Sequence, residues 1–150
     1  MKSLRNEHCR EELIRRINTL TPDAKPEWGK MNAEQMLSHL VQAGELPFEA
    51  SAPDRSSFMS RNVIKHLVLT MVPIPKEVPT GPEMDQQRQG RPPQGFEIDK
   101  ANAIESLHKL GTLSLDHKCL GHPFFGKMSV NQWCRLAYKH ADHHLRQFGV

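Results

Sequence analysis

Cysteine is scarce in this sequence, and neither positive nor negative charge is in large excess. Only Cys9, Cys119 and Cys134 occur in 150 residues, widely spaced and without a C-x-x-C pair. This pattern disfavours both a disulfide framework and a zinc ribbon, so we expect free thiols. The formal net charge is +3, and the densest basic points lack interleaved aromatic residues. We therefore expect no nucleic-acid partner.

Long hydrophobic runs are also lacking. The longest apolar stretch, HLVLTMVPI, is far shorter than the ~20 residues of a membrane-spanning helix. The first residues, MKSLRNEHCREEL, contain no apolar segment typical of a secretory signal. We expect a cytoplasmic protein with no membrane partner. A length of 150 residues with 37% hydrophobic residues fits one folded domain over residues 1–150.

Amphipathic helices are what the sequence does contain. Apolar residues recur at helical spacing from Glu7 to Leu20 and again from Phe96 to Leu110, where Gly111 is expected to end the helix. The segment RSSFMSRNVIKHLVLTMV shows the same spacing over a shorter length and ends before Pro73.

Two further helices begin with nearly the same phrase, GKMNAEQ and GKMSVNQ. Asn32 and Ser129 can cap these helices, with Gln35 and Gln132 completing a capping box in each. The methionine before each cap is placed to form a hydrophobic staple. An internal duplication would explain the repeat, but the similarity ends after eight residues, so we favour convergence on a good capping sequence.

Residues 73–96 separate the short helix from the next one and hold six of the eleven prolines. A proline-rich loop of this length commonly serves a function, here as a wall or lid of a pocket. No convincing strand pattern is present. The sequence therefore predicts an all-α protein, a four-helix bundle with an extra short helix and a long proline-rich loop.

Histidines are concentrated near the end of the chain, in KHADHHLRQF. On a helix, His140 and His144 share the apolar stripe with Trp133 and Phe148, whereas His143 lies at its edge. Each buried ring nitrogen left without a partner costs about 1–3 kcal/mol. A metal ion would satisfy both rings, because side chains at i and i+4 project to the same side.

A metal would need a third ligand, and His39 in the other capped helix is the best candidate. It lies at the edge of that helix's apolar stripe, with Gln35 and Gln42 beside it. The alternative is a boundary histidine hydrogen-bonded to a carbonyl group or a glutamine. Spacing alone does not separate these two interpretations.

The chain resembles the DinB-like (DinB/YfiT) superfamily, whose members are described as metalloenzymes, and most closely its branch of unknown function, DUF1569. The resemblance is carried by LTPDAKPEWGKMNAEQMLSHL, VPTGPE and HPFFGKMSVNQWCRLAYKHADHHLRQFGV. It implies a four-helix bundle of up-down-down-up topology, often dimeric. It also implies a metal site formed by His39, His140 and His144.

Three neutral imidazoles leave one to three coordination positions, as in a catalytic site, and would suit zinc or nickel. Such a site could activate water or a small thiol, giving a hydrolase or a thiol S-transferase acting on a small molecule. Relatives in the superfamily imply a low-molecular-weight thiol as cosubstrate. Peptidase activity is not expected, because Ala141 stands where the H-E-x-x-H motif has its glutamate and Asp142 points away.

The remaining histidines and aromatic residues are given plainer roles. His122 and His143 are candidates for contact with the metal ligands, although we favour a simple turn for His122. His8, His66, His108 and His117 are expected at the surface or its boundary. We expect Trp28, Trp133, Phe124 and Phe125 in the core.

Two alternatives to an enzyme stay open. One is a dimeric, non-enzymatic binding module of the same fold, whose metal is structural or absent. The other is a purely structural histidine cluster, which requires every ring nitrogen to find a partner in the protein.

Overall fold

The computed structural model describes residues 1–50 and 52–150, and within them the protein is all-α, as predicted. No β-strand forms in these residues, where the pairing of His122 with Gly126 is an isolated bridge. The helices are α1 (Glu7–Thr19), α2 (Ala33–Glu45), α3 (Lys65–Thr70), α4 (Phe96–Thr112) and α5 (Val130–Gln147), with a π-helical turn η1 (Ser60–Ile64) before α3 and a 3₁₀ turn η2 (Pro82–Met84) between α3 and α4.

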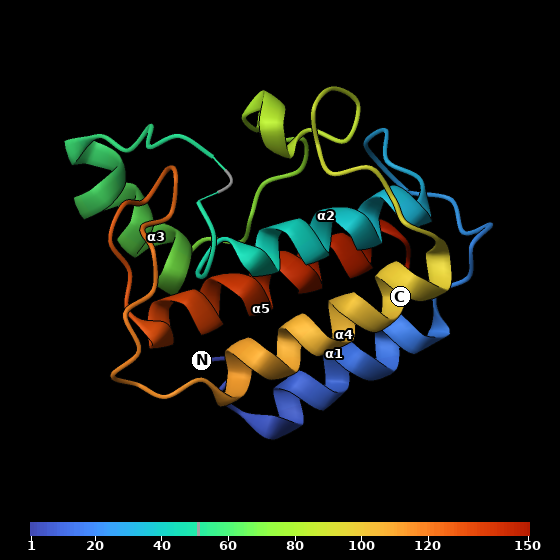
Figure 1. Ribbon diagram of the computed structural model, residues 1–150, viewed down its shortest axis with the longest axis horizontal. Helices are drawn as coiled ribbons and strands as arrows, with labels where there is room; N and C mark the ends of the chain where they lie inside the picture. Colours follow the sequence, from blue (N-terminus) through green and yellow to red (C-terminus); the bar gives the residue numbers. More distant parts are fainter. Residues whose placement is uncertain (51) are drawn as a thin grey trace.

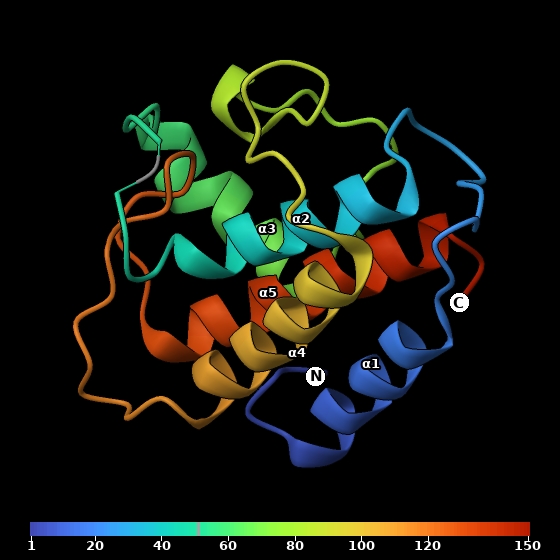
Figure 2. The same ribbon diagram turned by 45° about the vertical axis from the view of Figure 1, so that its right-hand side comes forward.

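The four long helices lie beside one another (Figure 1). α1 and α5 run in one direction through the molecule, and α2 and α4 run in the opposite direction (Figures 1 and 2). α2 packs against α4 and α5, and α1 packs against the same two helices. The short helix α3 lies at one end of this group, against α5.

The expected capping boxes are present at both α2 and α5. The Asn32 side chain accepts a hydrogen bond from the Gln35 backbone N–H at 2.8 Å, and the Gln35 side chain accepts one from the Asn32 N–H at 3.1 Å. Ser129 and Gln132 repeat this exchange. Each box satisfies N–H groups that have no partner within the helix, which fixes where the two histidine-bearing helices begin.

The core is formed by apolar side chains from all four long helices. Leu13, Leu37, Leu110 and Leu145 are each 1% exposed or less. Burying one such side chain contributes about 1.5–3 kcal/mol. Cys9, Cys119 and Cys134, all within the described residues, are free thiols, as expected.

The predicted end of α4 at Gly111 is wrong. The helix continues to Thr112, and Leu113 is its C-cap. A Cβ atom at position 111 would lie 2.7 Å from the Leu4 carbonyl oxygen and 2.9 Å from Cδ of Arg10. Glycine is therefore required here by the close approach of the N-terminal segment, not by a left-handed turn.

The shorter helix predicted before Pro73 is present, but most of its apolar residues lie outside the core. Phe58 is 81% exposed and Met71 is 76% exposed, whereas Leu69 is buried. No helix in the described part of the chain combines the length and the apolar character needed to cross a membrane.

Candidate metal site

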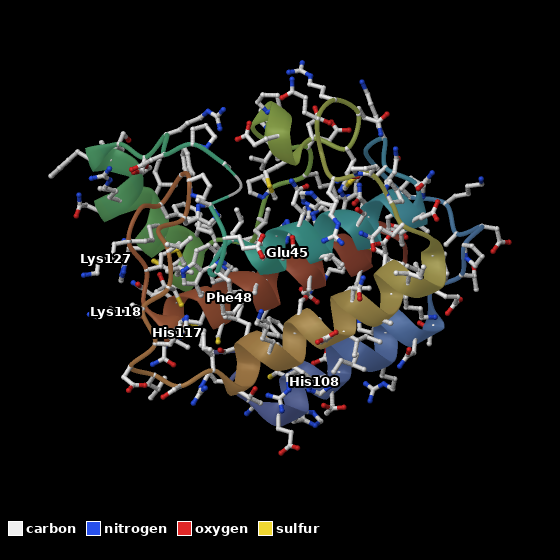
Figure 3. The ribbon with its side chains drawn as sticks, viewed as in Figure 1. Glu45, Phe48, His108, His117, Lys118 and Lys127 are labelled. Carbon is white, nitrogen blue, oxygen red and sulfur yellow. The ribbon has the colours of Figure 1, made fainter. Side chains whose placement is uncertain are left out.

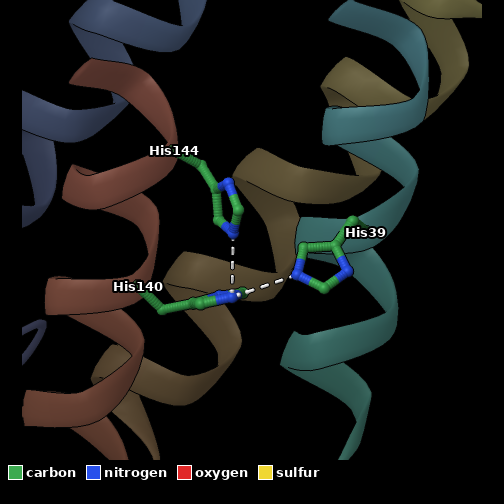
Figure 4. Close-up of side chains that lie close together, drawn as sticks. All are labelled: His39, His140 and His144. Atoms are coloured by element: carbon green, nitrogen blue, oxygen red, sulfur yellow. Dashed lines mark hydrogen bonds between the residues drawn. The ribbon is translucent and has the colours of Figure 1, made fainter. Parts of the chain in front are cut away.

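Three histidine rings from two helices converge between α2 and α5 (Figure 4). Nε2 of His140 lies 3.1 Å from Nε2 of His39 and 3.1 Å from Nε2 of His144. All three ligand atoms lie within 4.8 Å of one another. Three nitrogens bound to one tetrahedral ion at ~2.0–2.1 Å would be about 3.3 Å apart. The three rings, called the histidine cluster below, therefore have a spacing that fits one ion.

The buried faces of the two helices place these rings. On α5, His140 and His144 are one turn apart, and each is followed by a buried residue, Ala141 and Leu145. On α2, His39 follows the buried residues Met36 and Leu37. His39 is 5% exposed and His144 is 8% exposed. His144 therefore has its predicted inward position with His140 partly buried beside it, and His39, predicted at the edge of its apolar stripe, is buried.

The tautomer of His144 follows from its neighbours. The Gln147 side-chain amide donates to the Trp28 carbonyl oxygen at 2.6 Å, so Oε1 of Gln147 faces His144. Nδ1 of His144 donates to that oxygen at 2.9 Å. A neutral imidazole carries one N–H, so Nε2 of His144 presents a lone pair to the centre of the cluster.

His39 is oriented in the same way by a backbone group. Its Nδ1 donates to the Met84 carbonyl oxygen at 3.2 Å, because a carbonyl oxygen can only accept. Nε2 of His39 therefore also presents a lone pair inward. Nε2 of His140 faces two acceptors and can donate to one of them at most. A cation at the centre would satisfy all three nitrogens, whereas the protein alone leaves one without a donor.

Burial keeps the three rings neutral. It lowers the pKa of His39 to about 4 and that of His144 to about 3. The pKa of His140 is held well below its usual range, first by burial and then by the neighbouring charges that His144 and His39 would carry. Neutral imidazole is the form that binds metal ions, so the cluster is ready to do so at neutral pH.

The segment between α3 and α4 forms one side of the site. It contains η2, and Met84 of η2 accepts the hydrogen bond from His39. Gln42 of α2 holds this segment at two points: its amide donates to the Glu83 carbonyl oxygen at 2.8 Å and accepts from the Arg91 N–H at 3.1 Å. Gln35 caps α2 and accepts a hydrogen bond from Gln87 at 3.2 Å. Both glutamines thus fix the segment that orients His39, and neither is bonded to a ring of the cluster.

His143 lies beside the cluster, whereas His122 belongs to a turn before α5. The ring of His143 stands 5.2 Å from that of His144 and 5.8 Å from that of Trp28, and burial lowers its pKa. His122 closes a turn, where its Nδ1 accepts from the Phe124 and Phe125 N–H groups at 3.1 and 3.2 Å. Burial lowers its pKa to about 4.

No carboxylate of the last helix reaches the cluster. Asp142 pairs with Arg16 at 2.7 Å and with Arg146 at 2.9 Å, and Ala141 is buried. The arrangement of an H-E-x-x-H metallopeptidase is therefore not present on this helix.

Four further histidines lie at the surface or its boundary, as expected. His8, His66 and His117 are exposed, and His108 is half-buried. Trp133 and Phe125 are buried in the core, as expected, and Trp28 is half-buried. Phe124 is 45% exposed, so its expected core position is wrong. It extends from the turn that His122 closes, while its neighbour Phe125 fills the interior.

Sequence reasoning missed the two groups that orient the rings. Gln147 stands three residues after His144 on the inward stripe, and this spacing was the available signal. The Met84 carbonyl is a backbone group in a loop far along the chain, so no residue pattern could have identified it.

The fold and the site define an all-helical protein with a buried group of three histidines that could hold a metal ion. The chain belongs to the family described as a protein of unknown function, DUF1569, whose model matches residues 1–149. No curated protein and no solved structure matches the chain.

Proposed function

We propose that His39, His140 and His144 bind one divalent metal ion, zinc or nickel, through their Nε2 atoms. The observation that carries the proposal is the convergence of these atoms. Nε2 of His140 lies 3.1 Å from each of the other two, which Met84 and Gln147 orient so that each presents a lone pair. Three protein ligands leave at least one coordination position open, as in catalytic sites.

We further propose that residues 1–150 form one DinB-like domain. The opposed directions of α1 and α5 against α2 and α4 support an up-down-down-up four-helix bundle. The segment between α3 and α4, anchored over the site by Gln42, would then be the pocket wall expected of the proline-rich loop.

The chemistry we propose is hydrolysis or thiol S-transfer on a small molecule. A divalent ion supplies Lewis acidity when bound, which activates water or a low-molecular-weight thiol as nucleophile near neutral pH. The chain's own part is to hold the three imidazoles neutral and to orient them. A cytoplasmic location and a homodimer remain predictions.

Metal analysis of protein purified without a polyhistidine tag tests the binding proposal. We expect about one zinc or nickel ion per chain. His140→Ala should abolish stoichiometric binding, because His140 contacts both other rings, whereas exposed His8→Ala should retain it. The proposal would be overturned if wild-type protein is purified without metal and if His140→Ala binds added metal as tightly as wild type does.

The burial of His39 and His144 favours one alternative, a non-enzymatic binding module with a structural metal. A structural site is closed by protein ligands and leaves no position for a reactant. Screening the metal-loaded protein with small thiols and electrophiles, and with small esters and amides, separates the two functions. Turnover lost in His140→Ala supports the enzyme, and metal binding without turnover in either screen supports the binding module.

A further inference from the structure

Two stretches of the chain contain no acidic residue. Residues 55–76 and 117–141 hold none of the 17 Asp and Glu residues, yet they hold eight of the 20 Lys and Arg residues. The small overall net charge of +3 therefore hides a strong local excess of positive charge. Such a segregation has an electrostatic cost, because like charges repel unless a partner neutralises them.

The fold brings these two stretches together. Lys65 donates through Nζ to the Lys127 carbonyl oxygen at 3.0 Å, and the Arg55 N–H donates to the Pro123 carbonyl oxygen at 2.8 Å. Lys139 of α5 donates to the Val72 carbonyl oxygen at 2.6 Å, just past the end of α3. Figure 3 shows Lys118 and Lys127 at the same end of the molecule as α3. Several of these positive charges thus gather at one end, whereas Lys76 lies over the Trp28 ring beside the last turn of α5.

Carboxylates from outside the two stretches neutralise only part of this charge. Asp54 pairs with Arg61 at 3.3 Å, and Glu83 pairs with Arg55. Arg135 is half-buried on α5, and no carboxylate in the described part of the chain lies within ion-pair distance of it.

A hollow of about 330 Å³ lies where η1 and α3 meet the start of α5. We call it the basic hollow, because Arg61, Lys65, His66 and Arg135 line it and none of its described lining residues is acidic. Asn62 and Gln132 add polar groups to its wall. Gln132 belongs to the first turn of the 18-residue helix α5, so the positive end of that helix dipole lies beside the hollow.

We propose that the basic hollow binds a phosphate group, carried by a small phosphorylated molecule or by a lipid headgroup. Guanidinium groups present paired N–H donors that match the oxygens of phosphate, and lysine adds a point charge. The hollow is separate from the histidine cluster, whose residues do not line it. The proposal therefore does not depend on the metal site.

The test uses the full chain, stripped of metal with a chelator that is then dialysed away. Calorimetric titration with pyrophosphate is one arm, and sedimentation with phosphatidylcholine vesicles, with and without phosphatidic acid, is the other. In whichever of the two experiments detects binding, Arg135→Gln should weaken the affinity about tenfold, as expected for a lost charge-assisted hydrogen bond. Arg15→Gln, which removes an exposed charge from α1, should change it little. Added salt should weaken it.

Each outcome decides the proposal. Saturable pyrophosphate binding identifies a small phosphorylated ligand, and binding only to vesicles with phosphatidic acid identifies a lipid headgroup. Binding in neither arm overturns the proposal, as does an equal loss in Arg135→Gln and Arg15→Gln. If thermal melting shows that Arg135→Gln does not fold, Lys65→Gln takes its place with the same expectations.

Discussion

α2 and α5 begin with the same capping box, yet they hold their histidines in different ways. α5 supplies a pair one turn apart and orients His144 with Gln147 from the next turn of the same helix. α2 supplies only His39, whose orientation depends on the carbonyl of Met84, 45 residues further along the chain. One half of the cluster is therefore built locally, and the other half requires the segment between α3 and α4 to dock.

Removing the local support on α5 should have the largest effect. Gln147→Leu leaves Nδ1 of His144 and the Trp28 carbonyl without their partners, so we expect metal affinity to fall by about 10–100-fold. Competition with a chromophoric chelator measures this. Gln147→Glu keeps an acceptor for His144 and should lose less. Equal metal affinities of Gln147→Leu and wild type would show that metal binding does not depend on this hydrogen bond.

Acid should affect both halves of the metal-free cluster together. In the unfolded chain histidine titrates near 6.5, whereas burial holds the pKa of His39 at about 4 and that of His144 at about 3. Between these values the unfolded chain binds protons that the folded protein does not. The contribution of these neutral histidines to the free energy of unfolding is therefore complete above about pH 6.5 and falls as the pH drops toward about 4.

Thermal melting of the metal-free protein between about pH 7 and about pH 5 measures this dependence. The melting temperature should fall with pH, and it should fall less steeply in His39→Gln, which removes one of the titrating groups. A melting temperature that is constant over this range in wild type would contradict neutral burial of the cluster.

Releasing the loop from α2 should have a smaller effect. Gln42→Leu removes the bonds to Glu83 and Arg91, but Ser38 still donates to the Arg91 carbonyl oxygen and Glu45 still pairs with Arg91. We expect metal affinity to fall less than about tenfold. Gln89→Leu, at an exposed position of the same loop, is the matched control. If Gln42→Leu lowers the metal affinity as much as Gln147→Leu does, the loop contributes as much to metal binding as the support on α5.

The smallest effects should come from the two caps. Ser129→Ala and Asn32→Ala each remove one side-chain bond to a backbone N–H, at a cost of about 1 kcal/mol of unfolding free energy. Urea denaturation should show similar losses, with metal affinity nearly unchanged. A cap variant that loses metal while keeping its stability would show that the start of the helix acts directly on the cluster.

The same contrast explains how much the sequence could predict. Helical periodicity placed His140 and His144 inward and His143 at the edge, and the capping boxes located the starts of α2 and α5, because these features are local. The place of His39 beside them needed the packing of α2 against α5. The role of Met84 and the close contact of Gly111 with Leu4 depend on long-range packing, on which periodicity carries no information.

The most direct test of the three-histidine site is X-ray absorption at the metal edge of tag-free, metal-loaded protein. The structure predicts scattering from three imidazole nitrogens at ~2.0–2.1 Å, reduced in His39→Ala. A first shell containing sulfur, or one of oxygen atoms without imidazole scattering, would contradict the site.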